Sequence, residues 1–174
     1  MKSKNELTNN KDFLLAKVLV YNQCGFKCTE PIPATESAEY GACDFRLDSL
    51  NIKYRMAKIT PTKTGQFVTL WKRNNEGIIE PYDINDEIDF VVISTRSDNH
   101  FGQFIFPKAV LLQKGILSGN YKEGKRAIRV YPPWDIANSK QALKTQQWQL
   151  AYFLEIPDNG LADLVLAKRL FGNQ

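Results

Sequence analysis

Histidine and cysteine, the usual ligands of structural metal sites, are scarce in this sequence. Its 174 residues include one histidine, His100, and three cysteines, Cys24, Cys28 and Cys43. An odd number of cysteines argues against a disulfide framework. Cys24 and Cys28 have the C-x3-C spacing of a metal-binding pair, but a four-ligand zinc site would need further partners that a single histidine does not supply. We therefore predict ordinary thiols and no bound metal.

Long hydrophobic runs are also missing. No apolar run approaches the roughly 18 residues that span a bilayer, and the polar residues 1–10 contain no signal-peptide core. We therefore expect a cytoplasmic protein with no membrane partner. A hydrophobic content of 43% is enough for a packed core, and the length fits one domain. We predict a single domain over 1–174, with a polar tail of about 1–10 and an amphipathic C-terminal segment of about 158–174.

Acidic residues are missing from one long stretch. Residues 49–75 contain six lysines and arginines and no acid. Residues 76–98 then contain seven acids and one base, and residues 100–149 contain eight bases and two acids. If the two basic stretches meet in the fold, they form a positive face suited to phosphate. The alternative is scattered surface charge that only keeps the protein soluble.

The pattern of apolar residues predicts an α/β (α+β) fold, in which helices flank a mixed central β-sheet. Helices are predicted over 11–23, 108–114, from a cap at Asn138 or Ser139 to about 155, and over 161–171. Strands are predicted over 40–47, 52–58, 66–73, 88–94, 102–106 and 127–131. The continuous apolar run 88–94 predicts a strand buried on both faces. The helix after Pro107 predicts a crossover to a strand 127–131 that lies parallel to strand 102–106.

Three segments combine cations with other groups that suit nucleic acid. The segment 58–67 joins two basic strands through a turn rich in threonine hydroxyls, which together with lysines are donors for phosphate oxygens. The segment 125–134 places three cations just before Tyr131 and Trp134, the combination that binds single strands. The helix 140–153 spaces Lys140, Lys144 and Trp148 along one face. For each segment the alternative is an ordinary structural or solvated role.

These segments carry a resemblance to the MepB family. It rests on the motifs Glu39-Tyr40-Gly41, Arg55-x-Ala57-Lys58-Ile59-Thr60-Pro61-Thr62-Lys63-x-Gly65-Gln66-Phe67-Val68, Trp71-Lys72-Arg73, Gly102-Gln103-Phe104-x-Phe106-Pro107-Lys108, Gly124-Lys125-Arg126, Arg129-Val130-Tyr131-Pro132-Pro133-Trp134 and Lys144-Thr145-Gln146-x-Trp148. The resemblance covers roughly residues 10–155. It implies a restriction-endonuclease-like PD-(D/E)XK fold, nucleic-acid binding and a bacterial cytoplasmic setting.

The usual catalytic residues of such a nuclease are not in place. The fold implies an acid on one strand and an acid-x-lysine motif on the next, which hold Mg²⁺ and activate water. Asp89 matches the first acid, but Gln103 and Ile105 stand where the second acid and the lysine are expected. We therefore predict a vestigial site at Asp89 and Gln103, with no catalytic residue and no cofactor. The alternatives are a metal-dependent nuclease that uses Mg²⁺ at a divergent site, and a protein-partner adaptor.

The predicted function is thus nucleic-acid binding without cleavage. Aromatic side chains beside cations favour RNA or single-stranded DNA over duplex. The predicted contact residues lie in the three segments and their flanking strands: Arg55, Lys58, Thr60, Thr62, Lys63, Gln66, Lys72, Arg73, Lys125, Arg126, Arg129, Trp134 and Lys144.

Overall fold

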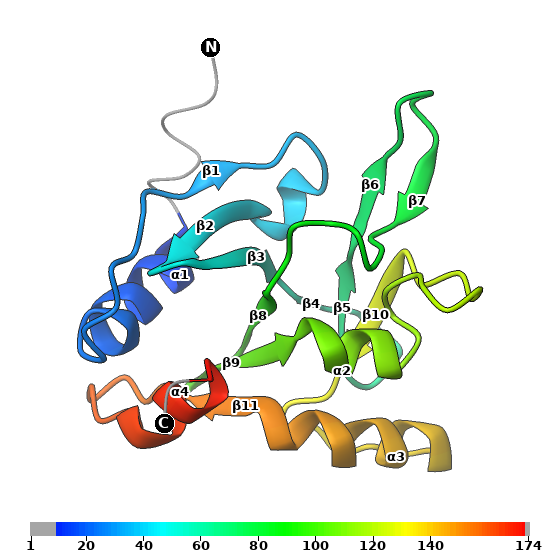
Figure 1. Cartoon of the computed structure of the whole chain (residues 1–174). Helices are drawn as coiled ribbons and strands as arrows, with labels where there is room; N and C mark the ends of the chain where they lie inside the picture. Colours follow the sequence, from blue (N-terminus) through cyan, green and yellow to red (C-terminus); the bar gives the residue numbers. More distant parts are fainter. Residues whose placement is uncertain (1–9, 173–174) are drawn as a thin grey trace.

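A six-stranded mixed sheet forms the centre of the molecule (Figure 1). The computed structural model describes residues 10–172. The strands follow the order β1 (Ile32–Pro33), β2 (Cys43–Leu47), β3 (Leu50–Met56), β8 (Phe90–Ser97), β9 (His100–Pro107) and β11 (Phe153–Glu155). β3 and β8 are parallel, whereas the other neighbours are antiparallel. The predicted mixed central sheet is confirmed.

β8 is the central strand that the apolar run predicted. Its residues Phe90 to Thr95 are all buried, because β3 and β9 flank it and helices or further strands cover both faces. One face packs against α1 (Lys11–Ala16), the π-helical turn Lys17–Tyr21 and α4 (Leu164–Leu170). The other face packs against α2 (Lys108–Gln113), α3 (Lys140–Gln149) and a small second sheet. Helices therefore flank the sheet as predicted.

Polar caps fix where the helices begin. The backbone N–H of Phe13 donates to Asn10 Oδ1 at 3.1 Å, and that of Ala142 donates to Ser139 Oγ at 3.1 Å, which confirms Ser139 as the cap of α3. Pro107 immediately precedes α2 as its N-cap residue. No helix within residues 10–172 is long and apolar enough to cross a membrane. The predicted polar tail lies almost wholly outside the described residues.

The second sheet contains β10 (Ala127–Val130), β5 (Gln66–Thr69) and β4 (Lys58–Ile59), all antiparallel. The predicted strand 66–73 is divided at Leu70, and its second half, β6 (Trp71–Arg73), forms a separate hairpin with β7 (Ile79–Pro81). The predicted parallel pairing of strand 127–131 with strand 102–106 is therefore wrong.

β11 explains this difference. The predicted helix to residue 155 ends at Gln149, passes through a 3-10 turn (Leu150–Tyr152), and continues as β11, in which Phe153 lies opposite Phe104 of β9. The free edge of β9 is thus occupied by β11, so β10 pairs elsewhere, with β5. The helix prediction failed here because Phe153 and Leu154 are buried in the sheet, a long-range contact that overrides local helical periodicity.

Candidate nucleic-acid interface

The two basic stretches of the sequence meet in the second sheet. Arg129 of β10 lies opposite Phe67 of β5, and Phe67 lies opposite Lys58 of β4. Directly opposed residues of antiparallel strands point to the same face, so the three side chains form a row. The guanidinium carbon of Arg129 lies 5.6 Å from the Phe67 ring centroid, and Lys58 Nζ lies 4.7 Å from the Tyr40 ring centroid. Cations and aromatic rings therefore alternate on this face.

A groove of about 600 Å³ lies beside this row. Its walls are the β4–β5 loop, β10, one side of α3 along its whole length and the segment that follows α2. Four of the lining residues are cationic: Lys63, Lys114, Lys125 and Arg129. Among the groove-lining residues that the structure describes, none is Asp or Glu. The groove is therefore a concentrated positive region in a chain whose formal net charge is only +4.

The N-terminus of α3 adds to the positive character of the groove. Asn138, the capping Ser139 and Gln141 all line the groove at the start of this ten-residue helix. The N-terminus of a helix carries a partial positive charge and backbone N–H groups that suit an anion. The hydroxyls of Thr62 and Thr145 are further donors among the lining residues.

Two aromatic side chains complete the groove. Tyr131 and Trp148 are half-buried lining residues. The Trp148 ring centroid lies 5.3 Å from that of Phe106, and Lys114 Nζ lies 5.3 Å from the same Trp148 centroid. Tyr131 packs so closely on Gly65 that a Cβ there would lie 2.6 Å from Tyr131 Cε1, and the φ of +80° at Gly65 also favours glycine. The loop thus needs glycine to approach the groove wall.

Two glutamines of α3 hold the groove wall together. The side-chain amide of Gln149 accepts from the Tyr131 N–H at 2.8 Å and donates to the Arg129 carbonyl at 3.0 Å. It thus bonds the backbone of β10 and its following residue as a neighbouring strand would. Gln146 Nε2 donates to the carbonyls of Pro132 and Asp135 at 3.0 and 2.9 Å. The glutamine side chains of this helix therefore fix β10 and the following turn against α3, and these two are not free to contact a ligand.

Arg55 is not part of any surface. Its side chain is fully buried on β3, and its guanidinium donates to the Tyr54 carbonyl at 2.8 Å and to the Tyr82 hydroxyl at 3.4 Å. The prediction that Arg55 contacts nucleic acid is wrong, because no polymer can reach it. Gln66 is corrected for the same reason: it is 1% exposed, and its Nε2 donates to the Arg96 carbonyl.

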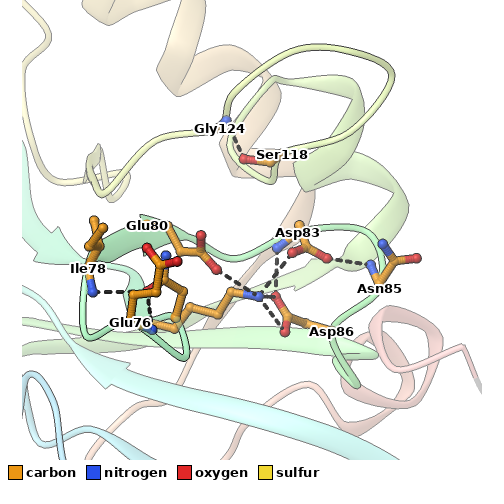
Figure 2. Close-up of polar contacts among 10 residues, drawn as sticks. Glu76, Ile78, Glu80, Asp83, Asn85, Asp86, Ser118 and Gly124 are labelled. Carbon is orange, nitrogen blue, oxygen red and sulfur yellow. Dashed lines mark hydrogen bonds and ion pairs between the residues drawn. The ribbon is translucent and has the colours of Figure 1, made fainter.

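Lys72 lies inside a cluster of carboxylates, and Figure 2 labels these as Glu80, Asp83 and Asp86. Its Nζ is 2.8 Å from Asp86 Oδ2, 3.0 Å from Asp83 Oδ2 and 3.6 Å from Glu80 Oε1. Burial alone would lower the pKa of Lys72, but the hydrogen bonds to Asp86 and Asp83 outweigh it and raise the pKa well above its usual value. Burial likewise opposes the shift at Asp83, whose pKa is nevertheless lowered by Lys72. These carboxylates neutralise Lys72, which adds no net positive charge to this surface.

The remaining predicted cations differ in their surroundings. Arg73 Nε lies 2.9 Å from Glu36, and Arg126 pairs with Glu123 at 2.6 Å, but both arginines are about half exposed and such pairs are weak. Lys144 is exposed on α3 and is not among the groove-lining residues. Thr60 is half-buried on the β4–β5 loop.

Trp134 packs at the edge of the core. Its ring stacks on His100 with centroids 5.0 Å apart and meets Phe153 edge-on at 5.7 Å. It is half-buried and does not line the groove. The sequence predicted that Trp134 stacks on a base, whereas the structure places a different tryptophan, Trp148, in the groove together with Lys114. Neither was predicted as a contact residue, although the spacing of Trp148 from Lys144 did indicate a shared helix face.

The two positions predicted as a vestigial nuclease site are far apart. Gln103 lies opposite Ser94 in the β8–β9 pair, whereas Asp89 precedes Phe90, which lies opposite Pro107. Five residues of β-strand separate Asp89 from Ser94, roughly 17 Å at about 3.3 Å per residue. Asp89 Oδ2 accepts the Asn51 N–H at 2.7 Å, and Gln103 is fully buried and donates to Ser94 Oγ. The idea that Asp89 and Gln103 form one site is therefore wrong, and the two do not fit a shared Mg²⁺.

The other acids, cysteines and the histidine of the described chain are not arranged as a metal site either. Among residues 10–172, no group of three or more His, Cys, Asp or Glu side chains is placed to hold a metal ion. Cys43 is buried and Cys24 and Cys28 are half-buried free thiols, and burial raises the pKa of Cys28 to about 11.

Comparison with known proteins places this mixed α/β domain, with its cation-lined groove, in a family. Residues 34–155 match the model of the MepB-like family, which is more than half of the chain. The chain therefore belongs to the MepB-like family, as the sequence motifs indicated. The crystal structure of MepB is similar with a TM-score of 0.73 and 33% sequence identity, over 83% of this chain and 96% of that chain.

A second solved structure is much more distant. The bacterial homing endonuclease I-Ssp6803I is similar with a TM-score of 0.47 and 15% identity, over 84% of this chain and 92% of that chain. This similarity is too low to support a conclusion about function. The comparison with curated proteins gave no match.

Proposed function

We propose that this protein binds nucleic acid in the groove between β10, α3 and the β4–β5 loop. The observation that carries the proposal is a groove of about 600 Å³ lined by four cationic side chains and, within the described residues, by no carboxylate. Phosphate backbones are bound through lysine and arginine contacts of this kind, supported by hydroxyls and helix N-termini. All three kinds of donor line this groove.

Single-stranded nucleic acid, RNA or DNA, is the favoured ligand. Tyr131 and Trp148 line the groove among its cations, and Phe67 lies between Lys58 and Arg129 on the adjoining face. Unpaired bases stack on aromatic and guanidinium planes, whereas the bases of a duplex are already stacked on each other. A surface that alternates cations and rings is therefore better matched to an unpaired strand.

Binding without cleavage is part of the proposal. Gln103 is buried beyond the reach of a phosphate, and the carboxylate of Asp89 is engaged by the Asn51 backbone. Gln103 therefore cannot serve as a second metal ligand beside Asp89, and the acid-x-lysine motif that would hold Mg²⁺ and activate water is missing from β8 and β9. The endonuclease-like ancestry and the bacterial cytoplasmic location that the family resemblance implies remain predictions.

A binding panel tests the proposal. Labelled single-stranded RNA, single-stranded DNA and duplex DNA of equal length are titrated with the protein in Mg²⁺ and in EDTA, and anisotropy is recorded. We expect binding in both buffers, tightest for a single strand. Absence of binding to all three ligands at low salt would refute the proposal. Binding that requires Mg²⁺ would favour the divergent nuclease instead.

The salt dependence of affinity distinguishes a nucleic-acid-binding protein from a protein-partner adaptor. Phosphate contacts release counterions, so affinity falls steeply as salt rises, whereas a hydrophobic protein interface is much less sensitive. A groove that binds only protein would give no salt-dependent complex with any of the three nucleic acids.

A further inference from the structure

A short hairpin between α2 and β10 has an unusual aromatic tip. Gly119 and Lys122 exchange two backbone hydrogen bonds of 2.9 Å, which close a turn around Asn120 and Tyr121. Both central residues have positive φ, 53° and 65°. Tyr121 has a relative exposure of 111%, the highest of the large exposed hydrophobic side chains of the described chain. The tip thus presents a complete tyrosine ring to solvent.

The fold gains nothing from this ring. Two-residue turns with positive φ at both central positions favour Asn followed by Gly. Asn120 fits the first position, but at the second position a bulky side chain is held in the left-handed region, where it is sterically disfavoured. A fully exposed ring has no packing that offsets this strain. Backbone strain without a structural benefit points to a functional role for the side chain.

The base of the hairpin is fixed to the groove. Ile116 and Lys125 both line the groove, and the Lys125 N–H donates to the Ile116 carbonyl at 2.9 Å. The Gly124 N–H donates to Ser118 Oγ at 2.7 Å (Figure 2), and a Cβ on Gly124 would lie 2.3 Å from the Ile116 carbonyl oxygen. The two strands of the hairpin are therefore in close contact at the groove wall, and the exposed tip extends from an anchored base.

The tip lies within reach of a strand bound in the groove. Tyr121 is four residues from Lys125, which is at most roughly 13 Å of extended chain. The exposed cations Lys122 and Lys125 follow Tyr121 along the same segment, and Arg126 follows them in a pair with the exposed Glu123. A strand whose phosphates contact Lys125 would therefore have its neighbouring bases near the ring.

We propose that Tyr121 stacks on an unpaired base of a single strand whose phosphates occupy the groove. This inference rests on the proposed function and adds a base-contacting residue outside the groove itself. The strained tip holds the ring away from the protein, so its face is available to a base before binding. Stacking of this kind tolerates any base, because every base has a π-face.

The test compares Tyr121→Gly with Tyr121→Phe. Glycine removes the ring and relieves the positive φ, so the variant should melt at or above the wild-type temperature. Because the variant loses one base–aromatic stack, Tyr121→Gly should bind a single-stranded oligonucleotide roughly 5- to 150-fold more weakly. Tyr121→Phe should bind like the wild type. Binding of inorganic polyphosphate, which has no bases, should be equal in all three proteins.

The outcomes separate the two proposals. Wild-type binding of the oligonucleotide with unchanged affinity in Tyr121→Gly would overturn the stacking role and leave the groove intact. An equal loss for oligonucleotide and polyphosphate would also overturn it, because the tip would then act on phosphate or on the groove's shape. No binding by the wild type would overturn the proposed function and with it this inference.

Discussion

Replacing Gln103 with leucine should destabilise the fold strongly and leave nucleic-acid binding in the groove unchanged. Gln103 accepts a hydrogen bond from the Tyr21 hydroxyl at 2.7 Å and donates to Ser94 Oγ at 3.0 Å, and Ser94 shares a further bond of 2.7 Å with Tyr54. All four side chains are at most 1% exposed. This network runs across the neighbouring strands β9, β8 and β3 and connects the π-helical turn to them.

The magnitude follows from the groups left behind. Leucine removes two hydrogen bonds and leaves the Tyr21 hydroxyl buried without a partner, while Ser94 retains Tyr54. The buried, unsatisfied Tyr21 hydroxyl costs about 1–3 kcal/mol, and the lost bond to Ser94, which leaves no orphaned group, costs about a further 1 kcal/mol. We therefore expect a loss of roughly 2–4 kcal/mol. Adding Tyr21→Phe removes the orphaned hydroxyl, so the double variant should be less destabilised than the sum of the single variants.

Urea unfolding of the wild type, both single variants and the double variant measures this coupling. Gln103→Glu extends the test, because it restores an acid where a nuclease was expected to have one. The new carboxyl would be buried, so we expect lower stability at neutral pH and no cleavage. Additive effects in the double variant, or a stable Gln103→Glu protein that cuts nucleic acid in Mg²⁺, would refute the reasoning.

Three further changes follow from the structure. Lys72→Met should lower the free energy of unfolding by about 1–3 kcal/mol at pH 7, between the values for exposed and buried ion pairs. Because the pKa of Asp83 is lowered in the folded protein, the stability that its ion pair with Lys72 contributes is lost as pH falls through that folded-state pKa. Urea unfolding should therefore show a smaller difference between the variant and the wild type at acid pH, and a constant difference would contradict the cluster. Trp134→Ala should lower the melting temperature, because it lowers the free energy of unfolding by less than the roughly 3–5 kcal/mol that a fully buried tryptophan costs. The variant should still bind nucleic acid at low temperature. A folded variant that has lost this binding would restore the predicted stacking role of Trp134. Asp89→Ala and the wild type should both leave labelled RNA and DNA intact in Mg²⁺ and Mn²⁺, and metal-dependent cleavage that disappears in the variant would establish the nuclease alternative.

Local patterns predicted much of the fold. The continuous apolar run gave the central strand β8, and the hydroxyl of Ser139 gave the start of α3. Both depend on interactions within a few residues of the chain. The pairing of β10 with β5 was not predictable in this way. It depends on β11, which lies some 25 residues after β10 in the sequence and occupies the edge of β9.

The candidate site was predicted in part for a similar reason. The sequence located the cations of the β4–β5 loop and of β10, because the acid-free run 49–75 and the clustered cations of 125–134 are visible without a fold. It did not show that Arg55 points into the core, since alternation along β3 distinguishes two faces without telling which elements cover them. The sequence did not indicate Lys114 as a groove residue, because its contact with the Trp148 ring is a long-range contact between the end of α2 and α3.

The most direct test of the account is the salt dependence of single-strand affinity after charge reversal in the groove. Lys63→Glu with Lys125→Glu changes two exposed groove cations, and Lys27→Glu with Lys168→Glu is a matched control with the same change in net charge at exposed positions outside the groove. Loss of two phosphate contacts should weaken binding at least tenfold at low salt and flatten the slope of log K against log salt by about 1.4. The control pair should keep a slope close to that of the wild type. Equal slopes and affinities in the groove variant and the wild type, with both proteins folded, would contradict the central claim.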